Sequence, residues 1–400
     1  MTVSPSETLP VLPFERPSIL EAPPLLLRLQ AERPVARVRT PAGDPAWLVT
    51  RYADVKELFS DHRLGRSHPD PERAPRYTNA AILGGPMAQA DTEVAQHTRM
   101  RRALTPSFMA KRMNGMRPGI QAVVDGVLDR IADLPRPVDL HAELAVPVPI
   151  LVICELLGVP YEDRDRFRTW SDQAAGMGDR AHAQAGMAQL HAYMAGLIAR
   201  KREERGEDVI SDLIAAADAD PDYTEQEMIG IAAGLLFAGH ETTILRIEFG
   251  VLLLLSDPVQ RQALQDDPAL ARTAVEEILR MAVPGLDVIP RYAAADLELD
   301  GATIRRGDLV LLSRAAANRD PAAFADPQRF DVRRQENQHV SFGHGHHFCI
   351  GAALARVELQ TVIGTLFRRL PTLRLAAPLE ELRLRDDSVT GGLRALPVTW

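Results

Sequence analysis

Cysteine is scarce in this chain of 400 residues, which contains only Cys154 and Cys349. Two cysteines cannot build a framework of several disulfides, so the fold must be stabilised mainly by its apolar core. Cys154 lies in the apolar run "PILVICELLG", which is typical of a buried structural thiol. Cys349 lies instead in a segment rich in histidine and glycine.

Long apolar runs are absent as well. The longest, such as "VLLLL" at residues 251–255, are far shorter than the roughly 18 residues that a membrane-spanning helix needs. The opening "MTVSPSETLPVLPFERP" has no basic start followed by an apolar stretch, unlike a secretion signal. We therefore expect no membrane association and a cytoplasmic location.

Positive charge is also in deficit, with 46 lysines and arginines against 54 acidic residues and a net charge of −8. This balance gives no support to a nucleic-acid partner. The sequence has no internal repeat, and its proline-rich patches are too short to be domain linkers. We expect a single domain over residues 1–400.

The apolar pattern predicts a mainly helical fold with small β sheets. The runs "PVARVRT" and "AWLVTRY" alternate in polarity on either side of the turn "PAGDP", which predicts a β-hairpin. Residues 100–280 follow mostly helical patterns. A second β region is expected at residues 295–313, where turns containing Asp-Gly and Arg-Gly-Asp separate short apolar runs.

One predicted helix is unusually long, over about residues 225–255. Thr224 and Glu227 form the capping-box pattern at its start, and "SDP" at residues 256–258 ends it. About thirty residues at 1.5 Å each span roughly 45 Å, the diameter of a whole domain. Such a long apolar helix is expected to cross the centre of the protein, so polar residues midway along it need a reason.

The segment "SFGHGHHFCIG" at residues 341–351 holds three histidines and Cys349. A zinc site would have to surround a tetrahedral ion with ligands that all lie within six residues, which is unfavourable. The interpretation of this histidine-rich segment as an exposed surface tract is disfavoured, because a strong helical pattern follows it immediately. Cys349 is therefore expected at the mouth of a helix, where the free amides should lower its pKa and favour the thiolate. A single thiolate suits an axial haem ligand.

This segment resembles the haem-binding signature of the cytochrome P450 family, F-G-x-G-x-[HR]-x-C-x-G, at every fixed position. The resemblance implies the family's fold, a triangular prism of helices. It also implies a haem b that lies between the cysteine loop and the long helix, with Cys349 as the ligand of its iron. It also implies that the haem contacts residues of the signature, namely Phe342, Gly343, His347 and Gly351.

The same resemblance assigns roles outside the loop. The H-x-x-x-R pair formed by His97 and Arg101, together with Arg291 and His347, would bind the haem propionates. Glu277 and Arg280 match the E-x-x-R pair, and Arg329 matches the arginine that completes its buried network. These last three are interpreted as structural, because buried charges must be fully paired.

The polar stretch "AGHETT" interrupts the long helix at residues 238–243. One interpretation is a helix kink, in which the Thr242 hydroxyl bonds back to the carbonyl of Ala238. The family resemblance implies more: Ala238 and Gly239 would leave room for dioxygen, while Glu241 and Thr242 would relay the protons that its activation consumes.

The resemblance also indicates where a substrate would bind. Most of the residues at these positions are small or apolar, which favours a bulky hydrophobic ligand, although Asp287 could bind an amine or hydroxyl. Phe237 and Val389 are equally compatible with core packing. The candidate substrate residues are Ile82, Gly234, Phe237, Leu286, Asp287, Ile289, Val389 and Thr390.

We expect no fused flavin or iron–sulfur domain, so the resemblance implies that electrons come from NAD(P)H through a separate ferredoxin and ferredoxin reductase. A basic face could attract an acidic ferredoxin, although these charges are as easily explained as a solvated surface. Its predicted members are Arg99, Arg101, Arg102, Lys111, Arg112 and Arg356.

The function expected from all of this is hydroxylation or epoxidation of a macrolide or other polyketide in secondary metabolism. Oxidative aryl or C–C coupling of a cyclic peptide is the alternative within the same class. A haem-binding sensor or carrier is the alternative from another class, which the intact Glu241–Thr242 pair argues against.

Overall fold

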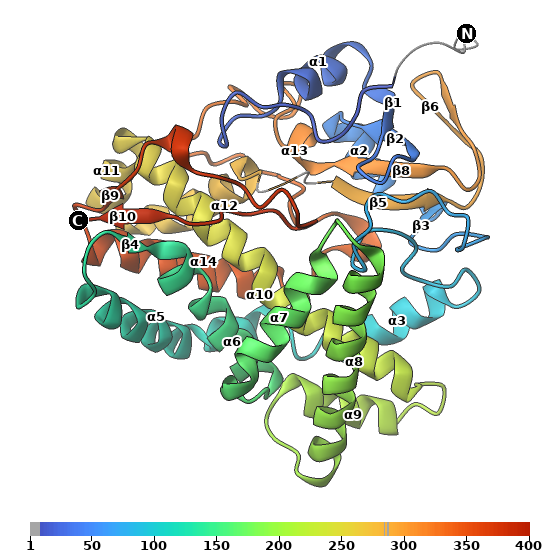
Figure 1. Cartoon of the computed structure of the whole chain (residues 1–400), viewed down its shortest axis with the longest axis horizontal. Helices are drawn as coiled ribbons and strands as arrows, with labels where there is room; N and C mark the ends of the chain where they lie inside the picture. Colours follow the sequence, from blue (N-terminus) through green and yellow to red (C-terminus); the bar gives the residue numbers. More distant parts are fainter. Residues whose placement is uncertain (1–8, 284, 286–287) are drawn as a thin grey trace.

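Helix α10, Glu225–Ser256, runs diagonally through the middle of the molecule (Figure 1). The computed structural model describes residues 9–283, 285 and 288–400. The predicted capping box is confirmed: the Glu227 amide donates to Thr224 Oγ1 at 3.1 Å, and the Thr224 amide donates to Glu227 Oε2 at 2.9 Å. Asp257 ends the helix and caps the next one.

The position of α10 explains its composition. From His240 to Leu254 every residue except Thr242 is buried, and α6, α8, α12 and α14 pack around it. By length and hydropathy alone this helix could span a bilayer, but here it is the central core helix. Gly239 is required where α10 meets α6, because a Cβ there would lie 2.3 Å from Ile153 Cδ1.

The other helices surround α10, with α5 to α9 on one side and the sheet region with α1 and α2 on the other (Figure 1). A π-helical turn, His141–Ala145, leads directly into α6. The helices before α10 are α1 Pro24–Glu32, α2 Tyr52–Leu58, α3 Glu93–Leu104, α4 Ala110–Gly115, α5 Arg117–Ala132, α6 Pro147–Leu157, α7 Arg164–Ala175, α8 Arg180–Glu203 and α9 Val209–Asp218. Those after it are α11 Pro258–Asp266, α12 Ala271–Met281, α13 Arg314–Ala317 and α14 Ala352–Arg369.

The largest sheet has the strand order β1-β2-β8-β5-β3. The predicted hairpin is confirmed, because β1 (Val35–Arg39) pairs antiparallel with β2 (Pro45–Val49). β8 (Leu309–Ser313) pairs in parallel with β2 and antiparallel with β5 (Val288–Ala293), which also pairs with β3 (Leu64–Gly65). The parallel pair joins segments some 260 residues apart in the chain.

Two smaller sheets complete the part of the chain that the structure describes. One joins β4 (Val138–Asp139), β10 (Pro397–Thr399) and β9 (Arg374–Leu375). The other is the hairpin of β6 (Leu297–Leu299) and β7 (Ala302–Ile304), whose turn places Asp300 and Gly301 at positive φ. The predicted mainly helical fold with small β sheets is confirmed.

Candidate functional site

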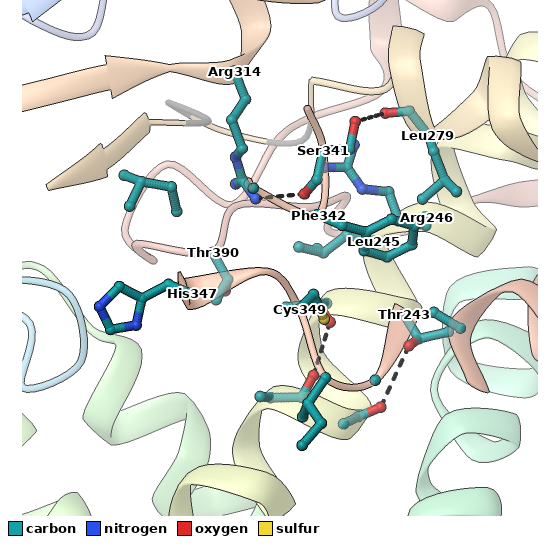
Figure 2. Close-up of a pocket in the computed structure, with 18 of the residues that line it drawn as sticks. Thr243, Leu245, Arg246, Leu279, Arg314, Ser341, Phe342, His347, Cys349 and Thr390 are labelled. Atoms are coloured by element: carbon teal, nitrogen blue, oxygen red, sulfur yellow. Dashed lines mark hydrogen bonds between the residues drawn. The ribbon is translucent and has the colours of Figure 1, made fainter. Parts of the chain in front are cut away.

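A cavity of about 350 Å³ lies between α10 and the cysteine loop. Figure 2 shows Cys349 in the middle of this site, with His347 to one side and Thr243 to the other. The fold brings together in its wall a large share of the predicted site residues: Ala238, Gly239, Thr242, Ile289, Arg291, Phe342, Gly343, His347, Cys349, Gly351, Val389 and Thr390.

Other predicted residues lie elsewhere. Ile82 and Phe237 are buried in the main core, and Phe237 packs edge-on against His240, as the core-packing alternative expects. Gly234 is exposed on α10 outside the cavity wall. The predicted contacts Leu286 and Asp287 lie outside the described residues.

The cysteine loop is bent by its glycines. Gly343 and Gly345 have φ values of 71° and 65°, a region that favours glycine. A Cβ at Gly345 would also lie 2.4 Å from Ser60 Oγ. The Cys349 amide then donates to the Phe342 carbonyl at 2.9 Å, which closes the loop before α14 begins.

A hydrogen-bond chain anchors this loop to α12 and α13. The Ser341 hydroxyl donates to the Leu279 carbonyl at 2.6 Å and accepts from Asn318 Nδ2 at 2.9 Å. Asn318 Oδ1 accepts from the Val340 amide at 2.8 Å, and Arg314 donates to the Ser341 carbonyl at 3.0 Å (Figure 2). The position of the sulfur is therefore set by elements outside the loop.

The predicted lowering of the Cys349 pKa is wrong for the thiol as it stands in this structure. Burial raises the pKa of Cys349 and outweighs the opposite effects of the Gly351 amide and the guanidinium of Arg314. Desolvation of the thiol is the largest effect on its pKa, and the position of Cys349 at the mouth of a helix does not reveal it. Coordination to a metal removes the thiol proton directly, so the raised pKa does not conflict with a ligand role.

The predicted ion pair between Glu277 and Arg280 is present and both side chains are fully buried. Its two hydrogen bonds measure 2.8 and 2.7 Å, so the pair is bidentate. Arg280 also donates to the carbonyl of Asn318, the residue that anchors the cysteine loop. The pair thus supports the loop from behind.

The third arginine of the network was predicted wrongly. The Arg329 side chain is exposed, and this residue contributes its carbonyl, which accepts from Arg280 at 3.1 Å. The guanidinium that reaches Glu277 belongs to Arg334, with Nε 3.2 Å from Oε1. The chain turns at residues 326–331, which directs Arg334 inward and Arg329 outward.

Positive groups gather at one end of the cavity. The rings of His97 and His347 lie 4.1 Å apart, and Arg101 donates to the Phe348 carbonyl at 3.0 Å. Burial and Arg66 lower the pKa of Arg291 to about 10, while burial and the nearby arginines lower the pKa of His97 to about 4. Burial is the larger cause for both bases, and the neighbouring arginines lower the pKa values further, so this end of the cavity gathers cationic groups that suit an anionic group.

Thr242 and Glu241 point in different directions. The Thr242 side chain lines the cavity, and its hydroxyl donates to the Ala238 carbonyl at 2.8 Å, as predicted. The Glu241 carboxylate is buried behind the wall, where Arg385 and the Thr390 hydroxyl each donate to it at 3.1 Å. Burial alone would raise the pKa of Glu241, but His240 and Arg385 lower it below its ordinary value.

Several cavity residues were not foreseen. Arg246 and Arg314 interrupt the apolar runs "TTILRIEF" and "VLLSRAAA", and a charge in such a run was a usable signal. Leu83 reaches the wall from the loop around residues 82–94, which the family resemblance had indicated as a source of substrate contacts, and it has a φ of 60°. Glu358 lies in the wall from α14.

The histidine-rich segment does not assemble into a zinc site. Within residues 9–283, 285 and 288–400, no three His, Cys, Asp or Glu side chains lie together so as to hold a metal ion. His344 and His346 are exposed, while the Cys349 sulfur lines the cavity alone. One thiol facing a large, mainly apolar cavity instead fits a flat prosthetic group with a single protein ligand.

Comparison with known proteins agrees with this geometry. The family model described as Cytochrome P450 matches residues 179–375. The chain is 45% identical to the pentalenolactone synthase of Streptomyces exfoliatus, over 98% of this chain and 99% of that protein. It is 42% identical to the mycinamicin IV hydroxylase/epoxidase of Micromonospora griseorubida, over 93% and 94% of the two chains.

A solved structure also resembles this chain in both fold and sequence. Substrate-free cytochrome P450 PimD, described as a polyene macrolide antibiotic pimaricin epoxidase, gives a TM-score of 0.88 at 44% identity, over 99% of this chain and 100% of that chain. Identity at this level along nearly the whole chain, within the same fold, establishes that the chain belongs to the cytochrome P450 family of haem-thiolate monooxygenases.

Proposed function

We propose that this monooxygenase hydroxylates or epoxidises a bulky, hydrophobic natural product of the macrolide or polyketide type, and that the whole chain acts as one haem-thiolate domain. The mainly apolar cavity wall around Cys349, with Leu83, Leu245, Ile289 and Val389, supports an apolar substrate. The relatives named for mycinamicin IV and pimaricin support the macrolide class.

Haem supplies the dioxygen chemistry when bound, and the residues of this chain fit it. Cys349 would be the ligand of the iron. We propose that Arg101 and Arg291, with His97 and His347, bind the propionates, because these anions would offset the positive potential at that end of the cavity.

The substrate class can be tested by optical titration of the haem-loaded protein. Mycinamicin IV and a polyene macrolide are the probes, and a small charged amphiphile serves as the contrast. Saturable displacement of water from the haem, seen as a spin-state change with the macrolides alone, is the expected result. A response confined to the charged amphiphile would overturn the proposed substrate class.

We propose that Thr242 holds the proton relay in position and that Glu241 supplies protons to this relay. Replacing Thr242 with alanine removes the hydroxyl from the cavity wall but leaves α10 intact. We expect product formed per NAD(P)H consumed to fall by at least about tenfold, with peroxide in its place. General acid catalysis typically contributes about 10²- to 10⁴-fold, so a loss of this size or more is expected. Peroxide and product are measured together in the same reaction.

The matched control is Thr243→Ala. Thr243 also lines the cavity on α10, and its hydroxyl makes a long 3.4 Å bond to the Gly239 carbonyl. If both alanine variants coupled equally well, the assignment of the relay to Thr242 would have to be abandoned.

Electrons are proposed to come from NAD(P)H through a ferredoxin and its reductase, which is consistent with a cytoplasmic location. The predicted basic face is smaller than the sequence suggested. Most of its arginines bind acidic neighbours within the chain: Arg99 with Glu227, Arg102 with Asp220, Arg112 with Asp212 and Arg356 with Glu276. Lys111 remains exposed, next to the exposed Met109.

Lys111→Glu is therefore expected to raise the apparent KM for an acidic plant-type ferredoxin several-fold and to flatten its dependence on salt. Arg28→Glu on α1 makes the same change of charge beside the five-stranded sheet and should have no such effect. Equal KM values for the two variants would argue against docking at this face.

A further inference from the structure

Residues 77–85 form a compact loop whose two ends meet beside the cavity. The amides of Tyr77 and Thr78 both donate to the Gly84 carbonyl, at 2.8 and 3.2 Å. Tyr77 from the start of the loop and Leu83 from near its end line the cavity wall. The φ of 60° at Leu83 is unfavourable for a leucine, so the rest of the loop has to hold this cavity residue in place.

The half-buried guanidinium of Arg76 lies among the backbone groups of this loop. Its Nε donates to the Thr78 carbonyl at 3.3 Å, and its Nη2 donates to the Ala80 carbonyl at 3.2 Å. Thr78 and Ala80 are fully buried, and within the part of the chain that the structure describes Arg76 is the only donor to their carbonyls. Burial of a carbonyl group without a donor is costly, so the loop depends on this side chain.

Two buried glycines allow the close packing inside the loop. A Cβ at Gly85 would lie 2.2 Å from Arg76 Nη1, and its three nearest atoms all belong to this guanidinium. A Cβ at Gly84 would instead lie 2.1 Å from the carbonyl oxygen of Ala80, a backbone atom. The two glycines thus adjoin different groups, so the contribution of the arginine can be separated from that of the backbone.

The backbone of Arg76 is fixed to the five-stranded sheet. Its amide donates to Asp44 Oδ2 at 2.7 Å, and its carbonyl accepts from Thr40 Oγ1 at 2.8 Å, both in the turn between β1 and β2. The carbonyl of Pro75 accepts from the Tyr292 hydroxyl of β5 at 2.8 Å. The arginine therefore extends from a rigid base into the loop that follows it.

We propose that Arg76 is a positioning residue for substrate binding, which holds residues 77–85 in the conformation that places Tyr77 and Leu83 in the cavity wall. Its guanidinium acts as a fixed cation between two backbone carbonyls. The Arg76 side chain is not part of the cavity wall, so it acts through the loop. This role rests on the proposed function, because it assumes that the substrate occupies this cavity.

Hydrogen exchange tests the positioning without any substrate. In the haem-loaded protein, Arg76→Ala should speed the exchange of the Tyr77 and Thr78 amides at least about tenfold, because their bonds require a closed loop. Exchange in α14 is the internal reference and should not change. Arg73→Ala is the matched control, since the Arg73 side chain is 89% exposed three residues earlier in the chain. Equal protection of the loop in the two variants would overturn the proposal.

A double-mutant cycle identifies the guanidinium as the group responsible. Gly85→Ala should speed the same exchange in the unmodified protein, because the added methyl group displaces the guanidinium, but should have little further effect in Arg76→Ala. Gly84→Ala should speed it in both backgrounds, because its methyl group meets the Ala80 carbonyl. If Gly85→Ala were equally harmful with and without the arginine, other contacts would hold the loop and the proposal would fail.

Two ligands of the haem iron test the consequence for the cavity. Clotrimazole is bulky and apolar, whereas imidazole offers the same nitrogen donor without the bulk. Arg76→Ala should raise the dissociation constant of clotrimazole about tenfold, because the binding-competent loop is only partly populated, and should leave that of imidazole unchanged. Added methylguanidinium should restore part of the clotrimazole affinity of Arg76→Ala and have no effect on the unmodified protein.

Neither ligand is a substrate, so the result is independent of the macrolide class, which the titration with mycinamicin IV tests separately. An unchanged affinity for clotrimazole in Arg76→Ala would refute the role of the arginine in the cavity. An equal loss of affinity for imidazole would contradict an effect that is confined to residues 77–85.

Discussion

Replacing Cys349 with serine is expected to abolish monooxygenase activity while the fold is retained. Serine preserves the size of the side chain and leaves intact the amide bond from residue 349 to the Phe342 carbonyl. It cannot supply a thiolate, whose electron density favours cleavage of the O–O bond. Product formation with NADPH, ferredoxin and reductase is the measurement, and circular dichroism checks the fold.

Cys154→Ser is the matched control. Cys154 is 4% exposed in the core, and burial raises the pKa of its thiol to about 12, so it is an unreactive packing group. This variant should lose some stability but keep its activity per bound haem. Substantial activity in Cys349→Ser would mean that another residue can serve as the ligand, and the account of the cavity would be wrong.

The second large effect concerns the network behind the cysteine loop. Arg334→Ala should lower the free energy of unfolding by about 3 kcal/mol, because it leaves the fully buried Glu277 with one fewer cation. Haem retention should fall as well. Arg280, which pairs with Glu277, donates to the carbonyl of Asn318, and the Asn318 side chain anchors the cysteine loop. Urea denaturation and haem content are the measurements.

Arg329→Ala tests the corrected assignment directly. Only the Arg329 carbonyl takes part in the network, so removing its exposed side chain should change stability by less than about 0.5 kcal/mol. If Arg329→Ala proved as destabilising as Arg334→Ala, the interpretation of the network would fail.

The central elements of the site could be predicted because local chemistry specifies them. The glycines around Cys349 are needed for its bent loop, and the capping box with "SDP" marks both ends of α10. The bond from Thr242 to Ala238 follows from helix geometry alone. These features depend on residues close together in the chain.

Features that depend on distant segments were missed. Arg334 replaces Arg329 because of a turn whose path the pattern did not specify. Glu241 turns towards Arg385, 144 residues away, rather than into the cavity. Glu358 belongs to "ARVELQ", which resembles an ordinary solvated helix until the packing of α14 is known. Burial is a property of the assembled fold, so it could not be seen in these short segments.

The measurement that tests the central claim most directly is the difference spectrum of the dithionite-reduced, haem-loaded protein with and without carbon monoxide. Ligation by Cys349 predicts the long-wavelength band of a haem-thiolate protein, and predicts its loss in Cys349→Ser but not in Cys154→Ser. A band at the shorter wavelength typical of histidine-ligated haem in the unmodified protein would contradict the assignment of Cys349.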